Sequence, residues 1–338
     1  MRPQTGQFLL YIIYCAESRA TQQFPMARKL RLEYEGALYH VMNRGDRQEP
    51  IFLDAADARM FIKTLGEACL KTDWEVHSFC LMINHFHLVV ETPRGNLVAG
   101  MKWLLGTYTG RFNQRHKFVG HLFSGRYKSL IVDGGSDNYL RTLCHYVHLN
   151  PARANLLQPS EALKEYPWSS FPEYLKPPRK RIGWLRVDRL LGELGIPKDS
   201  TAGRRRFERL TEERREADNQ ADFKGIRRGW ALGDKAFRKE LLAQMSEAVG
   251  PNHYGEERRE SLNEKAERIV ADEMKRLDWT TEDLKAKRKG DLDKVRIAQR
   301  LRAETTISLN WIAQRLEMGT PAYVNNRLYL LRQKRLGS

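Results

Sequence analysis

Hydrophobic and polar positions follow two different periods along the first half of the chain. Segments rich in Val, Ile, Phe and Tyr alternate with segments in which apolar residues recur every three or four positions. The first pattern is typical of β-strands and the second of amphipathic helices. The predicted strands are residues 37–43 (ALYHVMN), 74–83, 86–91 and 127–132. The predicted helices are residues 55–71, 96–116 and 136–149.

These elements follow the order strand, helix, strand, strand, helix, strand, helix. The second and third strands are separated by only two residues, so we expect them to form a hairpin. Turn signals with glycine close the first and third strands, at NRG (43–45) and TPRG (92–95). The pattern therefore predicts an α+β fold, an antiparallel sheet backed by helices.

The second half of the chain has a different composition. Residues 176–181 (KPPRKR) combine proline with positive charge, and the sequence beyond them is polar and helical. Residues 204–219 form a charge run, which we interpret as a solvated helix face or a linker. We predict a first domain at 26–175, a basic helical linker region at 176–259 and a second, all-α domain at 260–338.

Residues 1–25 are expected to be a disordered extension. They contain one short apolar run, FLLYIIYC (8–15), which is a poor signal peptide because only Arg2 precedes it. The sequence MARK at 26–29 reads like a protein start.

Charge points to a polyanionic partner. Among 338 residues, 58 Lys and Arg exceed 42 Asp and Glu by 16, and both halves of the chain are basic. Such an excess favours nucleic acid first and an anionic membrane second. The four cysteines form no CxxC pair, which argues against a zinc ribbon. The sequence contains no run of ~18 apolar residues, so it predicts no membrane-spanning helix. We expect a cytoplasmic, nucleoid-associated protein without membrane contact.

Two histidines, His85 and His87, lie two positions apart at the start of the predicted third strand. Residues two apart in a strand project from the same face, whereas Phe86 and Leu88 project from the other. Two imidazoles on one face can chelate a divalent metal ion. The alternative is an exposed or hydrogen-bonded pair with no metal.

The helix at 136–149 and the residues after it supply the other candidate groups. Tyr146 and Asn150 are four residues apart and share a helix face. A carboxamide oxygen suits Mg²⁺ or Mn²⁺, and a tyrosine beside such an ion can attack a phosphodiester. The alternatives are a buried helix tyrosine and a cap before Pro151. Tyr139 is the rival nucleophile, but Leu143 stands four residues after it.

Three motifs together resemble a known family. They are MINHFHLVVETP (82–93), GHLFSGRYKS (120–129) and HYVHLNP (145–151). Their order and spacing are similar to those of single-tyrosine HUH transposases, and within these to REP-associated tyrosine transposases. The resemblance covers about residues 27–172. Ile83 departs from the proline or aspartate of many relatives, which affects turn geometry more than chemistry.

The resemblance implies a ferredoxin-like antiparallel sheet with helices on one side, the HUH nuclease core. It implies His85, His87 and Asn150 as ligands of Mg²⁺ or Mn²⁺ and Tyr146 as the nucleophile. The tyrosine would form a 5′-phosphotyrosine and leave a free 3′-hydroxyl. The substrate would be single-stranded DNA folded into a hairpin.

Basic and aromatic residues near these motifs are candidate DNA contacts, because cations meet phosphates and aromatic rings stack on bases. Each alone is an ordinary surface residue. The candidates are Arg44, Arg47, Arg111, His121, Arg126, Tyr127, Lys128 and Arg153.

The end of the chain predicts a helix-turn-helix. Residues 308–316 and 321–332 have helical patterns, and EMGT (317–320) between them supplies a turn glycine and an N-cap threonine. The region resembles the DNA-binding domain of the initiator DnaA over about 260–335. Duplex or hairpin-stem contacts are expected from Tyr323, Asn325, Asn326 and Arg327. A plain helical hairpin is the alternative.

The leading hypothesis is a metal-dependent transposase that cleaves hairpin DNA and also binds DNA through its C-terminal region. The second is a non-catalytic or regulatory DNA-binding protein domesticated from a transposase. A metal-dependent hydrolase of RNA or nucleotides is the third. We expect a monomer, with a dimer as the alternative.

Overall fold

The computed structural model describes residues 32–135, 138–217, 223, 226, 230–247 and 257–336. The expectation for residues 1–25 lies outside this part of the chain. None of the helices in the described part is long and apolar enough to cross a membrane.

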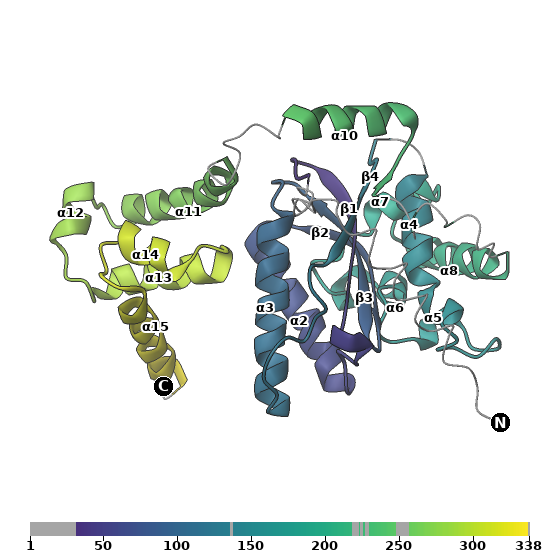
Figure 1. The fold of residues 1–338 in the computed structure, drawn as a ribbon, viewed down its shortest axis with the longest axis horizontal. Helices are drawn as coiled ribbons and strands as arrows, with labels where there is room; N and C mark the ends of the chain where they lie inside the picture. The colour runs from purple at the N-terminus through teal and green to yellow at the C-terminus, as the bar shows by residue number, and fades with distance from the viewer. Residues whose placement is uncertain are drawn as a thin grey trace, which may run out of the picture. The chain divides into compact units, whose positions relative to one another are not determined.

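A five-stranded sheet forms the centre of the first domain (Figure 1). Its strands are β1 Ala37–Arg44, β2 Glu75–Met82, β3 His85–Thr92, β4 Lys128–Val132 and β5 Ala231–Leu232. The order across the sheet is β2-β3-β1-β4-β5. Neighbours among the first four strands are antiparallel, while β5 is parallel to β4. Parallel pairing needs a long crossover, and the chain indeed returns to β4 about 100 residues later.

The predicted ferredoxin-like α+β core is confirmed. Its order is β1, α2 (Ala55–Thr72), β2, β3, α3 (Leu97–His116) and β4. The α4 helix (Tyr139–His148) follows, then the short α5 (Asn150–Arg153). These bounds lie close to those that the hydrophobic periods predict.

The strand register divides the sheet into two faces. Opposite residues of an antiparallel pair share a face, and His87 stands opposite Met42 while Phe86 stands opposite Asn43. His85 and His87 therefore share one face with the side chain of His40, as their alternation predicts. Phe86, Leu88 and Val90 of β3 project from the opposite face of the sheet.

The face that carries Phe86 packs against α2 and α3, drawn on one side of the sheet in Figure 1. The ring centroids of Phe61 on α2 and Phe86 lie 4.9 Å apart, and Tyr108 on α3 lies 5.0 Å from Phe61. All three side chains are fully buried. Asp54 caps α2 by accepting hydrogen bonds from the backbone N–H groups of Ala56 and Asp57.

The histidine-bearing face is covered as well, which differs from the expectation of helices on one side. The α4 helix contacts β2 and β3. Three further helices belong to this layer: α6 (Phe171–Leu175), α7 (Asp188–Glu193) and α8 (Thr201–Glu216). The α7 helix contacts α4, and α8 contacts α6. A sheet with a helical layer on both faces buries α4 against the histidines.

Part of the region predicted as a linker, 176–259, packs on this second layer. Phe207 of α8 is fully buried and stacks at 4.8 Å on the ring of Tyr174. The Tyr174 hydroxyl donates to the carbonyl oxygen of His77 on β2. The charge run is thus the exposed side of a helix whose buried residues, Phe207 and Thr211, face the domain. The same region contains β5 and α10 (Lys235–Glu247).

The C-terminal region is helical, as predicted. It contains α11 Glu257–Arg276, α12 Thr281–Ala286, α13 Leu292–Glu304, α14 Leu309–Arg315 and α15 Pro321–Leu336. A core of its own includes Leu301, Ile312 and Val324. Between α14 and α15, Gly319 has φ +90°, and the Thr320 hydroxyl accepts from the backbone N–H of Tyr323. A left-handed turn residue followed by an N-cap lets α15 start in a new direction.

Candidate active site

Both histidines of β3 are hydrogen-bonded through their Nδ1 atoms. His85 Nδ1 lies 2.8 Å from Asn84 Oδ1, and His87 Nδ1 lies 2.9 Å from His40 Nε2. Because each Nδ1 is engaged, the Nε2 atoms of His85 and His87 remain for a further ligand. The two rings lie 5.1 Å apart at 80°.

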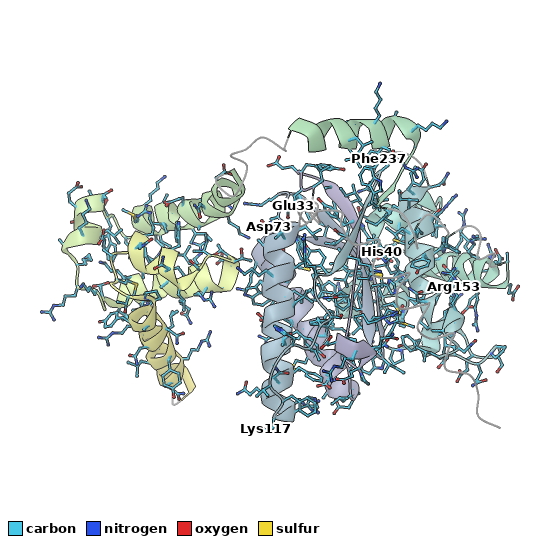
Figure 2. The ribbon with its side chains drawn as sticks, viewed as in Figure 1. Glu33, His40, Asp73, Lys117, Arg153 and Phe237 are labelled. Atoms are coloured by element: carbon cyan, nitrogen blue, oxygen red, sulfur yellow. The ribbon has the colours of Figure 1, made fainter. Side chains whose placement is uncertain are left out.

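His40, labelled in Figure 2, lies on β1 and contacts one member of this pair, His87. Its ring stacks on the His87 ring, with centroids 5.1 Å apart and planes 11° from parallel. In the hydrogen bond between them, one nitrogen donates and the other accepts. This bond fixes the orientation of the His87 imidazole, as outer partners of metal-ligating histidines do.

The histidines of the site are neutral at physiological pH. Burial lowers the pKa of His85 to about 4, and the positive charge of Arg44 adds to the effect. Burial lowers the pKa of His40 to about 4. The pKa of His87 falls well below its usual value because of burial, then the neighbouring His40, His85 and Arg44. Neutral imidazole is the form that binds a metal ion.

Tyr146 on α4 reaches the same cluster. Its ring centroid lies 5.7 Å from that of His87 and 5.6 Å from that of His40. The structure thus brings together a phenol and three imidazoles from three elements that are distant in the sequence. Arg153 stacks above the Tyr146 ring, with its guanidinium carbon 5.3 Å from the centroid.

Asn150 begins α5, four residues after Tyr146, and is buried. Its Nδ2 atom has no hydrogen-bond partner among the described residues. The two ends of a carboxamide are nearly isosteric, so this buried position can equally present the oxygen. A buried amide without a partner is expected where a ligand completes its bonding.

The donor set fits a divalent cation only in part. The described residues contain no group of three or more His, Cys, Asp or Glu that could hold a metal ion. Two neutral imidazoles and one carboxamide fit an ion that also takes oxygen atoms from a phosphate substrate. The fit therefore depends on Asn150.

Two of the candidate DNA contacts flank the histidines on the sheet. Arg44 is exposed and stands opposite His85, and Lys128 is exposed and stands opposite Met42. Both therefore belong to the histidine-bearing face of the sheet. A phosphate approaching His85 would meet both charges.

The other candidates of this domain have different surroundings. Arg111 binds Glu67 and Thr64 on α2, on the opposite layer, so the structure does not bring it to the site. Tyr127 is buried. The remaining candidates are exposed: Arg47 in the short 3-10 helix Asp46–Gln48, and His121 and Arg126 in the loop before β4.

The C-terminal candidates lie on α15. Asn325 and Asn326 are exposed. Arg327 donates to the Tyr323 hydroxyl at 2.8 and 3.0 Å, so these two side chains form a pair on one helix face.

Two residues at the site are not among those the sequence pattern singles out. His40 has an ordinary strand position, and only the register of β1 against β3 places it beside His87. Phe223 lies 5.6 Å from the Tyr146 ring, and Arg153 stacks on it at 4.0 Å. The only sequence signal for His40 is its place in the alternating segment HVM (40–42) of β1.

Residues 33–150 match the family model described as transposase IS200 like. The matched segment begins four residues before β1, runs through α4 and ends at Asn150. Over these residues the chain is similar to IS200-like transposases, as the three motifs indicate. The likeness of residues 260–335 to DnaA stays a prediction.

One solved structure similar to this chain is that of a REP-associated tyrosine transposase bound to a REP hairpin. The identity is 13%, over 48% of this chain and 90% of that chain, with a TM-score of 0.37. No curated protein matches this chain.

Proposed function

We propose that the chain is a metal-dependent single-strand DNA endonuclease and strand transferase, a transposase, that acts on palindromic hairpin DNA. The observation that carries this proposal is the approach of the Tyr146 ring to within 5.7 Å of His87. The match of residues 33–150 to IS200-like transposases supports the same reaction class.

In the proposed reaction, Tyr146 Oη attacks a phosphorus atom of the DNA strand. The new O–P bond forms as the bond from phosphorus to the 3′ oxygen breaks. The phenol proton passes to solvent, and the 3′ oxygen takes up a proton and leaves as a hydroxyl. The 5′ phosphate stays attached to Tyr146, so the bond energy is kept for rejoining by a 3′-hydroxyl in the reverse step.

His85, His87 and Asn150 would hold Mg²⁺ or Mn²⁺, which neutralises charge on the phosphate oxygens when it is bound. His40 orients the His87 ring through the 2.9 Å hydrogen bond. Arg153 bonds the carbonyl oxygen of Tyr146 at 3.3 Å and stacks on its ring, which restrains the nucleophile. These contacts prepare the site before DNA binds.

The DNA would lie along the basic rim of the histidine face, beside Arg44 and Lys128. The exposed residues Arg47, His121 and Arg126 are further candidate contacts. The exposed polar side chains of α15 would bind duplex or the hairpin stem, Asn325 and Asn326 at base edges. We expect a monomer, with a dimer as the alternative, and the approach of Tyr146 to a histidine of its own chain supports the monomer.

The test is a covalent-adduct assay with labelled hairpin oligonucleotides that carry single-stranded flanks. With Mg²⁺ or Mn²⁺, the wild type should retain label on a denaturing gel. Tyr146→Phe should abolish the adduct and leave DNA binding intact, because only the attacking oxygen is lost. Tyr139→Phe, on the same helix, is the matched control and should retain the adduct.

Two results would overturn the proposal. If Tyr146→Phe still forms the adduct, another residue is the nucleophile. If the wild type binds the hairpins but never cleaves them, the chain is a DNA-binding protein without this activity.

A further inference from the structure

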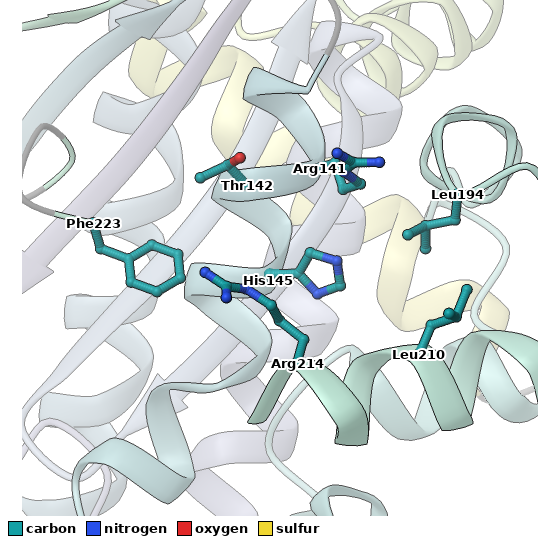
Figure 3. Close-up of a pocket in the computed structure, with 7 residues that line it drawn as sticks. All are labelled: Arg141, Thr142, His145, Leu194, Leu210, Arg214 and Phe223. Atoms are coloured by element: carbon teal, nitrogen blue, oxygen red, sulfur yellow. The ribbon is translucent and has the colours of Figure 1, made fainter. Parts of the chain in front are cut away.

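The short helix α7 contacts both elements that carry the candidate active site. One is β3, which bears His85 and His87, and the other is α4, which bears Tyr146. The start of α4 and the end of α7 meet at a pocket that Arg141 of α4 and Leu194, directly after α7, both line (Figure 3). The contacts of α7 therefore connect the tyrosine to the histidines.

Arg189 joins α7 to β3. Its Nη1 atom donates to Glu91 Oε2 at 2.7 Å, and its Nη2 atom donates to the carbonyl oxygen of Gly134 after β4. The same Glu91 oxygen lies 3.0 Å from His77 Nε2 and 3.4 Å from Arg186 Nη1. The Glu91 side chain is only 16% exposed, so solvent weakens these charge-assisted bonds less than it weakens a surface ion pair.

Glu193, the last residue of α7, caps the start of α4. Its Oε2 atom accepts from the backbone N–H of Arg141 at 2.9 Å, and its carbonyl oxygen accepts from the Arg141 guanidinium at 3.5 Å. The first turn of α4 contains no acidic residue, and its N-cap residue, Asn138, makes no side-chain capping bond among the described residues. A carboxylate from another helix supplies the missing cap and complements the positive end of the helix dipole.

These contacts form one route from the histidines to the tyrosine. Glu91 lies four positions after His87 and projects from the same face of β3. Arg189 and Glu193 are also four residues apart, so they share one face of α7. Tyr146 belongs to the helix that Glu193 caps. We call this set of contacting residues the α7 path: Glu91, Arg189, Glu193 and Arg141.

The opposite end of α4 is fixed separately. His148, its last residue, is buried, and its Nε2 atom lies 2.9 Å from Ser170 Oγ. Ser170 Oγ in turn donates to the carbonyl oxygen of Phe79 on β2 at 3.2 Å. Because this end of the helix is held on the sheet, the orientation of α4 depends on the contact at its other end, where Glu193 binds.

We propose that the α7 path positions Tyr146 against His87, with Arg189 and Glu193 as positioning residues. The inference rests on the proposed function, because it takes Tyr146 as the nucleophile. Both positioning residues lie outside residues 33–150, the segment that matches IS200-like transposases. Precise placement matters because a displacement of about 1 Å at a reacting group can slow a reaction about 100-fold.

The first experiment measures the rate of adduct formation in a single turnover, at saturating hairpin DNA and Mn²⁺. Glu193→Ala and Arg189→Ala should each lower this rate at least about tenfold, which corresponds to about 1.4 kcal/mol. The dissociation constant for the hairpin should stay unchanged, because neither side chain is a candidate DNA contact. Glu193→Gln keeps an oxygen that accepts from the Arg141 N–H and should recover most of the rate.

The double variant Arg189→Ala/Glu193→Ala tests whether the two contacts act as one unit. Breaking one path twice does little more than breaking it once, so the double variant should be about as slow as the slower single variant. Independent contacts would multiply their effects, and such a product would overturn the proposal. Asp199→Ala is the control, because it removes ion pairs with Arg181 and Arg204 in the same helical layer, and it should keep the wild-type rate.

Backbone amide hydrogen exchange is a readout that needs neither DNA nor cleavage. In Glu193→Ala and Arg189→Ala, the amides of α4 should exchange at least about tenfold faster than in the wild type, while those of β3 stay protected. Unchanged exchange of α4 in both variants would overturn the proposal. Faster exchange with an unchanged adduct rate would also overturn it, because α7 would then support the fold without positioning the tyrosine.

Failure of the proposed function has a different signature. A wild type that forms no adduct would contradict the proposed function. Faster exchange of α4 in the two alanine variants would, in that case, still support the anchoring of α4 by Arg189 and Glu193.

Discussion

The two faces of the central sheet satisfy their polar atoms differently. On the α2–α3 face, the Tyr108 hydroxyl donates to the carbonyl oxygen of Ile51 at 2.6 Å, and Trp74 Nε1 donates to Asn96 Oδ1 at 2.9 Å. In the described α4 layer, by contrast, buried atoms of His145, His148 and Asn150 lack partners. On the Phe86 face, Nδ2 of Asn43 is also buried without a partner in the described part of the chain. The difference between the two faces is therefore one of number, with more such atoms in the α4 layer.

This difference separates stability from chemistry. Burying aromatic rings such as Phe86 stabilises the fold, whereas buried polar atoms without partners cost free energy. Sites that violate the rules of a well-packed core are expected to be functional. Adjacent residues of β3, Phe86 and His87, project to the two faces and allow the difference to be measured one position apart.

The largest effect on stability is expected for Phe86→Ala. The ring is fully buried against Phe61, so its removal should lower the free energy of unfolding by about 3–5 kcal/mol. Urea unfolding measures the change, with Leu53→Ala, at a half-exposed side chain, as the control. A loss below about 1 kcal/mol would mean that this face is not the main core.

His87→Gln should weaken metal binding strongly and stability only slightly, the opposite of Phe86→Ala. The amide can still bond His40, so the free energy of unfolding should fall far less than for Phe86→Ala. The loss of an imidazole ligand should weaken Mn²⁺ binding at least about 100-fold, the upper range for losing an outer partner. Calorimetric titration with Mn²⁺ measures the affinity. Unchanged affinity would remove His87 from the ligand set.

The supporting role of His40 predicts an intermediate effect. His40→Phe keeps a ring stacked on His87 but removes the hydrogen bond to its Nδ1 atom. Mn²⁺ affinity should fall about 10–100-fold. His40→Gln, which can restore a hydrogen bond, should recover part of it. If both variants bind Mn²⁺ with wild-type affinity, His40 has a packing role and does not position His87 for the metal ion.

The smallest predicted effect is the loss of folding stability that His148 causes at acidic pH. Burial lowers the pKa of His148 to about 3, against about 6.5 in an unfolded chain. Between these values the unfolded chain binds a proton that the folded chain does not, so stability falls as the pH falls from 6.5 towards 3. From pH 7 to pH 5, His148 should account for at most about 2 kcal/mol of this loss.

Unfolding of His148→Gln at the two pH values tests this assignment. The variant should lose less stability on acidification than the wild type. Ser170→Ala removes the hydroxyl that lies 2.9 Å from His148 Nε2 without removing the titrating group, and should keep the wild-type dependence. Identical pH dependence of His148→Gln and the wild type would contradict the assignment.

Local sequence patterns predicted the features that depend on residues close together in the chain. Alternation on β3 placed His85 and His87 on one face. The helix predicted at 136–149 ends at His148, and Asn150 begins the separate helix α5. Periodicity also predicted the order of strands and helices up to α4.

Features that depend on distant pairing could not be predicted in this way. His40 joins the site through strand register, and Phe223 through the return of the chain after α8. The strand β5 has two residues, too few to show a period. Arg111 pairs with Glu67, and nothing in the sequence distinguishes such an ion pair from a phosphate contact.

The most direct measurement is peptide mapping of the protein–DNA adduct after nuclease digestion. We predict that mass spectrometry finds the residual 5′-phosphate nucleotide on Tyr146. A nucleotide mass on Tyr139, or on any other residue, would contradict the account.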